Sequence, residues 1–315
     1  MSRPERGDAA AATFLVRPRA PFRLDLTVWA LRRRKRNRMD VWDGTYRRAL
    51  VVGGRALTVR VEAGGDLSRS VLTVSVLTPG SYTGEVLSAV EGQVVRLLGT
   101  NVDLGRFYEL AEADPRVGPL ADRLVGLRPP RFPTLFEAIG NAIANQQLSL
   151  EVGIELLNRL TERFGARPLD GHGLVAFPEP ESILGAQVAD LRDLGFSLRK
   201  SEYLMDAAHA IITGLIDTER LEVSDRDTAT RLLLALRGIG RWSAEYVLLR
   251  GLGRLDVFPA DDVGARNKLK RFMNLAHEPS RDDIVEMMEP WSPFAGMIYF
   301  HLLLDGLAER GELDV

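Results

Sequence analysis

The chain has 315 residues, of which 45% are hydrophobic and 27% are charged, a composition typical of folded globular proteins with room for about two domains. The absence of cysteine excludes a disulfide framework, a thiolate zinc site, a cysteine-ligated iron–sulfur cluster and a cysteine nucleophile. Because the formal net charge is -2, any attraction to nucleic acid must come from local basic patches.

The first third of the chain has mostly strand-like patterning. Residues 1 to about 20 show little periodicity, which predicts a frayed start. Short β-branched and aromatic runs then alternate with Gly-Gly pairs, which predicts antiparallel strands at 22–29, 49–52, 57–62 and 71–77. Apolar residues recur at helical spacing from Val86 to Leu97, which predicts a helix against the sheet. We expect an α+β N-terminal domain over residues 1–115.

The second part of the chain, residues 116–315, has helical periodicity almost throughout and predicts an all-α domain. Helices are predicted near 103–113, 134–144, 149–164, 180–190, 199–213, 226–236, 241–251, 262–273, 281–288 and 293–309. No apolar run is long enough to cross a bilayer, and no secretory signal is recognisable. The sequence therefore predicts a cytoplasmic protein without membrane contact.

The most informative segment runs from Leu236 to Tyr246. Two helical patterns are separated here only by Gly238-Ile239-Gly240, whose glycines permit a tight reversal while Ile239 fills the core between the helices. This pattern predicts a helix-hairpin-helix. Exposed amides of such a hairpin, with Arg241 beside them, can bind a DNA phosphate without reading sequence. An ordinary tight turn between two helices has the same local pattern.

Further segments extend the hairpin pattern. Trp242 and Asp262 lie 20 residues apart, which leaves room for one helix and a return loop. Distinctive runs also occupy 132–139, 145–149, 194–200 and 256–262. Together they resemble the DNA glycosylase superfamily named for its helix-hairpin-helix, Gly/Pro-rich loop and Asp (HhH-GPD), and within it the DNA-3-methyladenine glycosylase II, or AlkA-like, type. The resemblance implies an α+β domain followed by an all-α helix-hairpin-helix glycosylase domain.

The resemblance implies that Asp262 is the catalytic carboxylate. Breaking a base–sugar bond builds positive charge at C1′, which a nearby carboxylate stabilises, and the same group can orient the attacking water. The competing structural role is to cap the following helix, as Asp residues commonly do. Asp261 is the better cap candidate, although the adjacent pair leaves an exchange of roles open.

Trp242 occupies the position where bifunctional relatives carry a lysine nucleophile. An indole forms no Schiff base, but it offers a flat wall for a flipped base and attracts a cationic alkylpurine. Tyr246 lies four residues further on, where it extends this wall or packs between helices. Lys200, Lys268 and Lys270 are the remaining lysines near this domain, and helical spacing aims none of them at the sugar.

Other polar segments have two interpretations each. By the resemblance, Gln147 and its neighbour Leu148 are candidates for the wedge that fills the gap left by a flipped nucleotide, whereas a helix cap or a surface position is the alternative for Gln147. The basic run from Arg32 to Arg38 adds phosphate contacts or forms a solvated loop. His301, among apolar neighbours, is interpreted as a packed histidine.

These features predict a monofunctional DNA glycosylase that flips alkylated purines out of duplex DNA and hydrolyses the N-glycosidic bond. Its expected partner is double-stranded DNA containing damaged bases, and we expect it to act as a monomer without a required cofactor. The resemblance implies a structural Na⁺ or K⁺ on the hairpin carbonyls of Leu234, Leu236 and Ile239. Two alternatives remain open: a noncatalytic DNA-damage-binding module, and a glycosylase for deaminated bases such as hypoxanthine.

Overall fold

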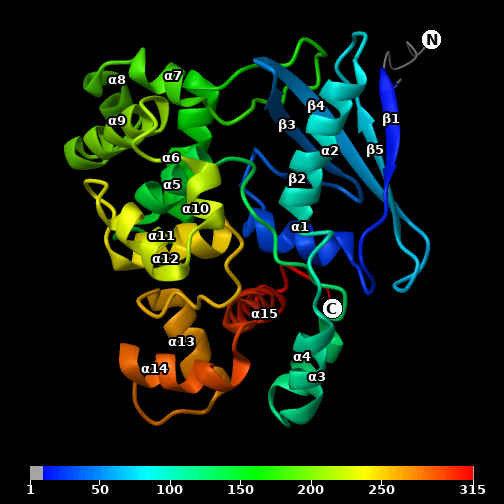
Figure 1. Cartoon of the computed structure of the whole chain (residues 1–315), viewed down its shortest axis with the longest axis vertical. Helices are drawn as coiled ribbons and strands as arrows, with labels where there is room; N and C mark the ends of the chain where they lie inside the picture. The colour runs from blue at the N-terminus through cyan, green and yellow to red at the C-terminus, as the bar shows by residue number, and fades with distance from the viewer. Residues whose placement is uncertain (1–9, 315) are drawn as a thin grey trace.

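The computed structural model describes residues 10–314, and a five-stranded antiparallel sheet forms one side of the molecule (Figure 1). The spatial order of the strands is β1-β5-β4-β3-β2. Their bounds are β1 Ala12–Val16, β2 Val41–Trp42, β3 Tyr46–Val52, β4 Arg55–Gly64 and β5 Val71–Val76. The predicted strands at 49–52, 57–62 and 71–77 are confirmed as parts of β3, β4 and β5. Gly53 and Gly54 form the turn between β3 and β4 with φ of 57° and 72°, as a two-residue hairpin requires.

The prediction of a frayed start is wrong for residues 12–16. This segment is β1, which pairs with β5 from Ala12 opposite Val76 to Val16 opposite Leu72. A five-residue edge strand carries too little periodicity to stand out, and its pairing with β5 defines it. Residues 1–9 lie outside the described residues.

The predicted strand at 22–29 is also wrong, because the segment forms helix α1, Leu24–Arg32. Nearly every residue of α1 is buried, so its sequence has no polar face to reveal a helical period. The predicted helix on the sheet is confirmed as α2, Gly84–Leu98. Thr83 caps α2 by accepting a hydrogen bond from the amide of Val86.

Helices make up the rest of the chain (Figure 1). They are α3 Gly105–Ala113, α4 Val117–Arg123, α5 Leu135–Asn145, α6 Leu150–Phe164, α7 Pro180–Leu184, α8 Val188–Asp193, α9 Leu198–Ile212, α10 Thr218–Val223, α11 Arg226–Leu234, α12 Arg241–Arg250, α13 Val263–Phe272, α14 Arg281–Met288 and α15 Ala295–Ala308. The sequence missed the short α4 and α10. It also merged α7 and α8, which a turn at Gly185 separates.

Two hydrophobic cores hold these elements together. One joins the sheet to α5, α6, α9 and α12, while the other joins α1 to α3, α4, α13, α14 and α15. Both cores contain residues from each side of the predicted boundary at residue 115, which stays a prediction. Buried Arg48 on β3 reinforces the first junction, because its guanidinium binds Asp40 at 2.6 Å and Glu137 of α5 at 2.5 Å. Within residues 10–314, no helix is long and apolar enough to cross a membrane.

Candidate active site

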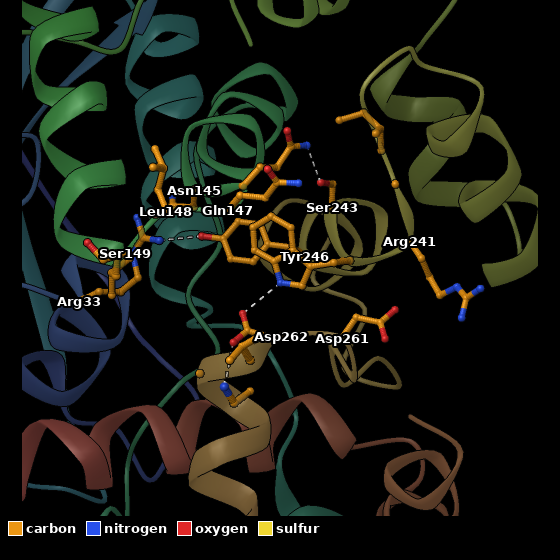
Figure 2. A pocket seen from close by; sticks show the side chains of 18 of the residues that line it. Arg33, Asn145, Gln147, Leu148, Ser149, Arg241, Ser243, Tyr246, Asp261 and Asp262 are labelled. Atoms are coloured by element: carbon orange, nitrogen blue, oxygen red, sulfur yellow. Dashed lines mark hydrogen bonds between the residues drawn. The ribbon is translucent and has the colours of Figure 1, made fainter. Parts of the chain in front are cut away.

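A cavity of about 1210 Å³ opens where both cores meet. Its lining comes from the end of α1, the α5–α6 loop, the start of α9, the turn before α12 and α12 itself, the start of α13 and the side of α15 (Figure 2). The residues predicted as catalytic, stacking, wedge and hairpin groups all line it: Gln147, Leu148, Gly238, Ile239, Gly240, Arg241, Trp242, Tyr246 and Asp262. The part of the chain that the structure describes contains no group of three or more His, Cys, Asp or Glu residues suited to a metal.

The predicted hairpin between α11 and α12 is present. Gly238 has φ +85°, and a Cβ there would lie 2.2 Å from the Tyr203 ring, so this position requires glycine. Ile239 is buried between the helices, as predicted. Gly240 is the exposed N-cap of α12, supplies no side-chain cap, and has open space around its Cα. The first amides of α12 therefore face the cavity mouth uncapped, in the manner of an anion site, with exposed Arg241 beside them.

The predicted wedge loop also lines the cavity, and it is hydrogen-bonded to the hairpin. The side-chain amide of Gln146 donates to the carbonyl of Gly238 at 2.7 Å and to Ser243 Oγ at 3.0 Å. Gln147 follows with φ +53°, a left-handed conformation that a side chain other than glycine rarely adopts. The side chain of Leu148 is 42% exposed. Ser149 caps α6, so the alternative of Gln147 as a helix cap is wrong.

Asp262 is fixed at both carboxylate oxygens (Figure 2). Its Oδ1 accepts a hydrogen bond from the amide of Ala265 at 2.8 Å, and its Oδ2 accepts one from Trp242 Nε1 at 3.1 Å. Asp262 is thus the N-cap of α13, and the expectation that Asp261 is the cap is wrong. Asp261 instead pairs with Arg281 at 3.0 Å. Capping and a site role are compatible here, because the cap uses one oxygen and leaves the other at the cavity.

Two aromatic side chains of α12 form one wall of the cavity. The ring centroids of Trp242 and Tyr246 lie 5.5 Å apart, and the ring planes are inclined by 32°. Trp242 is half-buried, whereas Tyr246 is only 2% exposed. Tyr299 of α15, which the sequence analysis did not single out, also lines the cavity. Its burial, together with the charge of Asp262, raises the pKa of the Tyr299 hydroxyl far above its usual range.

The basic run separates into residues that face inward and residues that face outward. Arg32 and Arg33 are buried, and Arg33 lines the cavity. Arg34 and Arg36 both bind Glu151, at 3.0 and 2.7 Å, and Arg38 binds Glu155 at 3.2 Å. The interpretation of the run as a solvated loop is therefore wrong for Arg32 and Arg33, whereas its contact with phosphate stays a prediction. Arg34 lines the cavity as well, and a run of similar cations contains no signal that marks which of them are buried.

Two lysines, Lys200 and Lys268, also lie on the cavity lining, and whether either one is aimed at the sugar stays a prediction. Lys200 Nζ donates to the carbonyl of Ala144 at 2.9 Å, and its burial lowers the pKa of that amine to about 8. Burial also lowers the pKa of Lys268, although the charge of Asp262 opposes this shift. Spacing along one helix did not reveal these positions, because the cavity is built by several helices.

The remaining predicted residues lie in their expected local settings. His301 is fully buried, its Nδ1 lies 2.7 Å from the carbonyl oxygen of Met297, and burial lowers its pKa to about 4. The prediction of a packed histidine is confirmed. Leu234 ends α11, and the carbonyl of Leu236 accepts a hydrogen bond from the amide of Ile239 at 3.1 Å. A carbonyl oxygen has a second lone pair, so this bond leaves room for a cation at Leu236.

Known proteins share both the sequence pattern and the fold. The family model of the HhH-GPD superfamily base excision DNA repair proteins matches residues 141–293, which contain the wedge loop, the hairpin and Asp262. A DNA-3-methyladenine glycosylase of Bacillus subtilis is 35% identical over 201 residues, which are 64% of this chain and 66% of that protein. DNA-3-methyladenine glycosylase 1 of Schizosaccharomyces pombe is 33% identical over 160 residues, 50% of this chain and 67% of that protein.

The likeness extends to the N-terminal part in three dimensions. The structure of a 3-methyladenine DNA-glycosylase from Archaeoglobus fulgidus superposes with a TM-score of 0.80 and 29% identity, over 96% of this chain and 100% of that chain. The sequence alignments, in contrast, span about two thirds of the length of the two curated relatives. From its sequence and its fold, the chain belongs to the HhH-GPD superfamily of base excision DNA repair proteins.

Proposed function

We propose that this protein is a DNA glycosylase that releases alkylated purines of the 3-methyladenine and 7-methylguanine type from duplex DNA. One observation carries the proposal: the carboxylate of Asp262 is held by Trp242 Nε1 at the edge of an aromatic cavity, beside an uncapped helix N-terminus. The names of the Bacillus and Schizosaccharomyces relatives support the choice of alkylated bases.

Each part of the cavity has a role in this proposal. The amides at Gly240 and Arg241 bind a phosphate, and Gln147 or Leu148 enters the gap left by the flipped nucleotide. The base stacks on Trp242. Asp262 then faces the sugar, where its negative charge stabilises the oxocarbenium-like transition state and orients the attacking water. Two fixed hydrogen bonds hold that carboxylate before the substrate arrives, so little reorganisation is required.

Positive charge on an alkylated purine already weakens its bond to the sugar, so one carboxylate suffices for departure of the base. Stacking against Trp242 adds a cation–π attraction of about 0.5–2 kcal/mol, which favours cationic bases by a modest factor. This argument predicts release of both 3-methyladenine and 7-methylguanine. Neutral hypoxanthine is expected to leave more slowly.

The proposal includes base release without strand cleavage, because Trp242 has no amine to attack C1′. Lys200 and Lys268 on the cavity lining make this worth testing directly. Borohydride treatment during the reaction should trap no covalent protein–DNA adduct. If an adduct is trapped in the wild type but not in Lys268→Gln or Lys200→Gln, the substituted lysine performs lyase chemistry.

We also propose that the protein acts as a monomer, and that Na⁺ or K⁺ bound at the carbonyls of Leu234, Leu236 and Ile239 steadies the hairpin when DNA is present. No cofactor enters the chemical step. Exchange of K⁺ for a bulky organic cation at constant ionic strength should weaken duplex binding without altering the fold.

The test of the main proposal is to incubate the purified protein with methylated duplex DNA and identify the free bases by chromatography. We expect both 3-methyladenine and 7-methylguanine from the wild type and neither from Asp262→Asn. Tight DNA binding without release of any base would support the noncatalytic module. Hypoxanthine leaving faster than both methylated bases would support the deaminated-base alternative.

A further inference from the structure

Arg33 lies at the inner end of the cavity in an unusual setting. It is the C-cap of α1 with φ +63°, and its side chain is only 3% exposed. Its Nη1 donates to the hydroxyl of Tyr246 at 2.8 Å (Figure 2). Its Nη2 donates to Asn141 Oδ1 at 2.7 Å. A left-handed backbone at a non-glycine residue is costly and persists only where the surroundings enforce it. The fold thus holds this guanidinium at the cavity.

The charge of Arg33 is not neutralised by a paired acid. Among residues 10–314, no carboxylate lies within ion-pair distance of it, and the nearby Glu137 is bonded to Arg48. The buried Nε of Arg33 has no hydrogen-bond partner among residues 10–314. A second buried cation, Arg250, also lies against the ring of Phe132. The guanidinium of Arg33 is therefore held at the cavity by neutral hydrogen-bond partners alone.

Tyr246 connects Arg33 to the cavity, because its hydroxyl is hydrogen-bonded to the guanidinium. Its hydroxyl oxygen accepts from Arg33, so its own hydrogen must be donated elsewhere. Within residues 10–314, no side chain or carbonyl accepts that hydrogen. Tyr246 lines the cavity next to Trp242, so a bound base can accept it. A hydroxyl that accepts from a cation becomes a stronger donor, because the two bonds polarise each other. The inner wall thus presents a donor to whatever base enters.

The chemistry of purines determines which atom meets this donor. A purine is joined to its sugar at N9, and its C6 substituent lies at the opposite end of the ring system. Asp262, the group proposed to face the sugar, is only half-buried, whereas Tyr246 and Arg33 are buried. A base stacked on Trp242 with its sugar at Asp262 therefore directs its C6 edge toward the Tyr246 hydroxyl. A carbonyl oxygen at C6 accepts that hydrogen bond, whereas an amino group at C6 does not.

We propose that Arg33 and Tyr246 form a specificity-determining pair that favours damaged purines with a carbonyl at C6. Among the bases expected from the proposed function, on which this inference rests, 7-methylguanine has that carbonyl and 3-methyladenine has an amino group in its place. The pair also stabilises the negative charge that a neutral oxo-base such as hypoxanthine develops as it leaves. Arg33 acts as a positioning residue, since it polarises and orients the hydroxyl of Tyr246.

The test compares two bases released in one reaction. Duplex DNA treated with dimethyl sulfate contains both lesions, and the ratio of 7-methylguanine to 3-methyladenine released at early times cancels differences in active enzyme. Tyr246→Phe keeps the stacking ring and removes the hydroxyl, so we expect this ratio to fall about three- to tenfold, the effect of one lost hydrogen bond. Arg33→Gln should lower the ratio in the same direction. Tyr82→Phe, outside the cavity, is the matched control and should leave it unchanged.

A duplex with a single hypoxanthine gives a second measurement, since its single-turnover release should fall in both variants as well. An unchanged ratio in Tyr246→Phe would overturn the inference, as would an equal loss of both bases. Because Tyr246→Phe retains the ring, its result decides the matter even if Arg33→Gln does not fold. Failure of the wild type to release either methylated base would instead contradict the proposed function.

Discussion

The rim and the inner wall of the cavity are built in different ways. At the rim, Leu148, Gly240 and Arg241 are exposed and come from two short continuous segments. At the inner wall, Arg33, Tyr246 and Tyr299 are buried and come from three helices far apart in the chain. The rim depends on local backbone geometry, which short motifs encode. The inner wall depends on the packing of α1, α12 and α15. Under the proposed function, this difference separates binding of any duplex, at the rim, from choice of a base, at the inner wall.

The largest effect is expected at Asp262, which lies between the two regions. Asp262→Asn removes the charge at the sugar while asparagine keeps a cap for α13, so the melting temperature should stay near that of the wild type. We expect single-turnover base release to fall about a hundred- to a thousandfold, with duplex affinity retained. Asp261→Asn is the matched control, since it weakens an ion pair with Arg281. Greater loss in the control would show that Asp261 is the catalytic group.

The rim was largely predictable from the sequence. The glycines at 238 and 240, the buried Ile239 and the helix that starts after the hairpin all follow from local steric rules, and the structure contains them. The inner wall was predictable only for Tyr246, by its spacing from Trp242. Arg33 follows a segment predicted as a strand, and its inward direction depends on a helix end that packing determines. Tyr299 is hidden in an apolar helix that gives no sign of facing a cavity.

Gly240→Val tests whether the rim binds DNA through its backbone. No atom lies within 4 Å of a Cβ at this position, so the fold should tolerate the change, whereas an approaching phosphate should not. Loss of one or two charge-assisted hydrogen bonds predicts about ten- to a hundredfold weaker binding of every duplex, independent of sequence. Gly84→Val, at the exposed start of α2, is the control and should bind normally. Weakening confined to one sequence context would mean that the hairpin reads bases.

Two substitutions at Trp242 can distinguish its two proposed roles, which are stacking against the base and positioning the carboxylate of Asp262. Both Trp242→Phe and Trp242→Leu lose the hydrogen bond to Asp262, but only the leucine variant also loses the aromatic face. The difference between them therefore reports cation–π stabilisation, and we expect about two- to thirtyfold slower release of cationic bases in Trp242→Leu than in Trp242→Phe. Hypoxanthine release should differ less between the two variants. If both variants release the cationic bases at equal rates, cation–π attraction does not contribute to the choice of base.

The smallest effect is a pH dependence at Lys200. Burial lowers the pKa of this amine to about 8, and a nearby phosphate favours its protonated form. Affinity should therefore be greatest below pH 8 and fall as the pH rises through this value, by about tenfold at most between pH 7 and pH 9. Titrations of binding at constant ionic strength measure this fall. Lys200→Arg should abolish it, because arginine stays charged, and a fall that persists in that variant would assign the titration to another group.

The packing of α1 against α15 has a consequence for how the protein is made. Leu26 and Trp29 of α1 belong to the same core as Phe300 and Leu304 of α15, although these segments lie near opposite ends of the chain. Synthesis on the ribosome proceeds from the N-terminus, so α1 emerges long before the helix that covers it. The cavity wall that contains Arg33 is consequently completed only after α15 has been synthesised. A nascent chain can therefore form its sheet well before it can form the complete cavity.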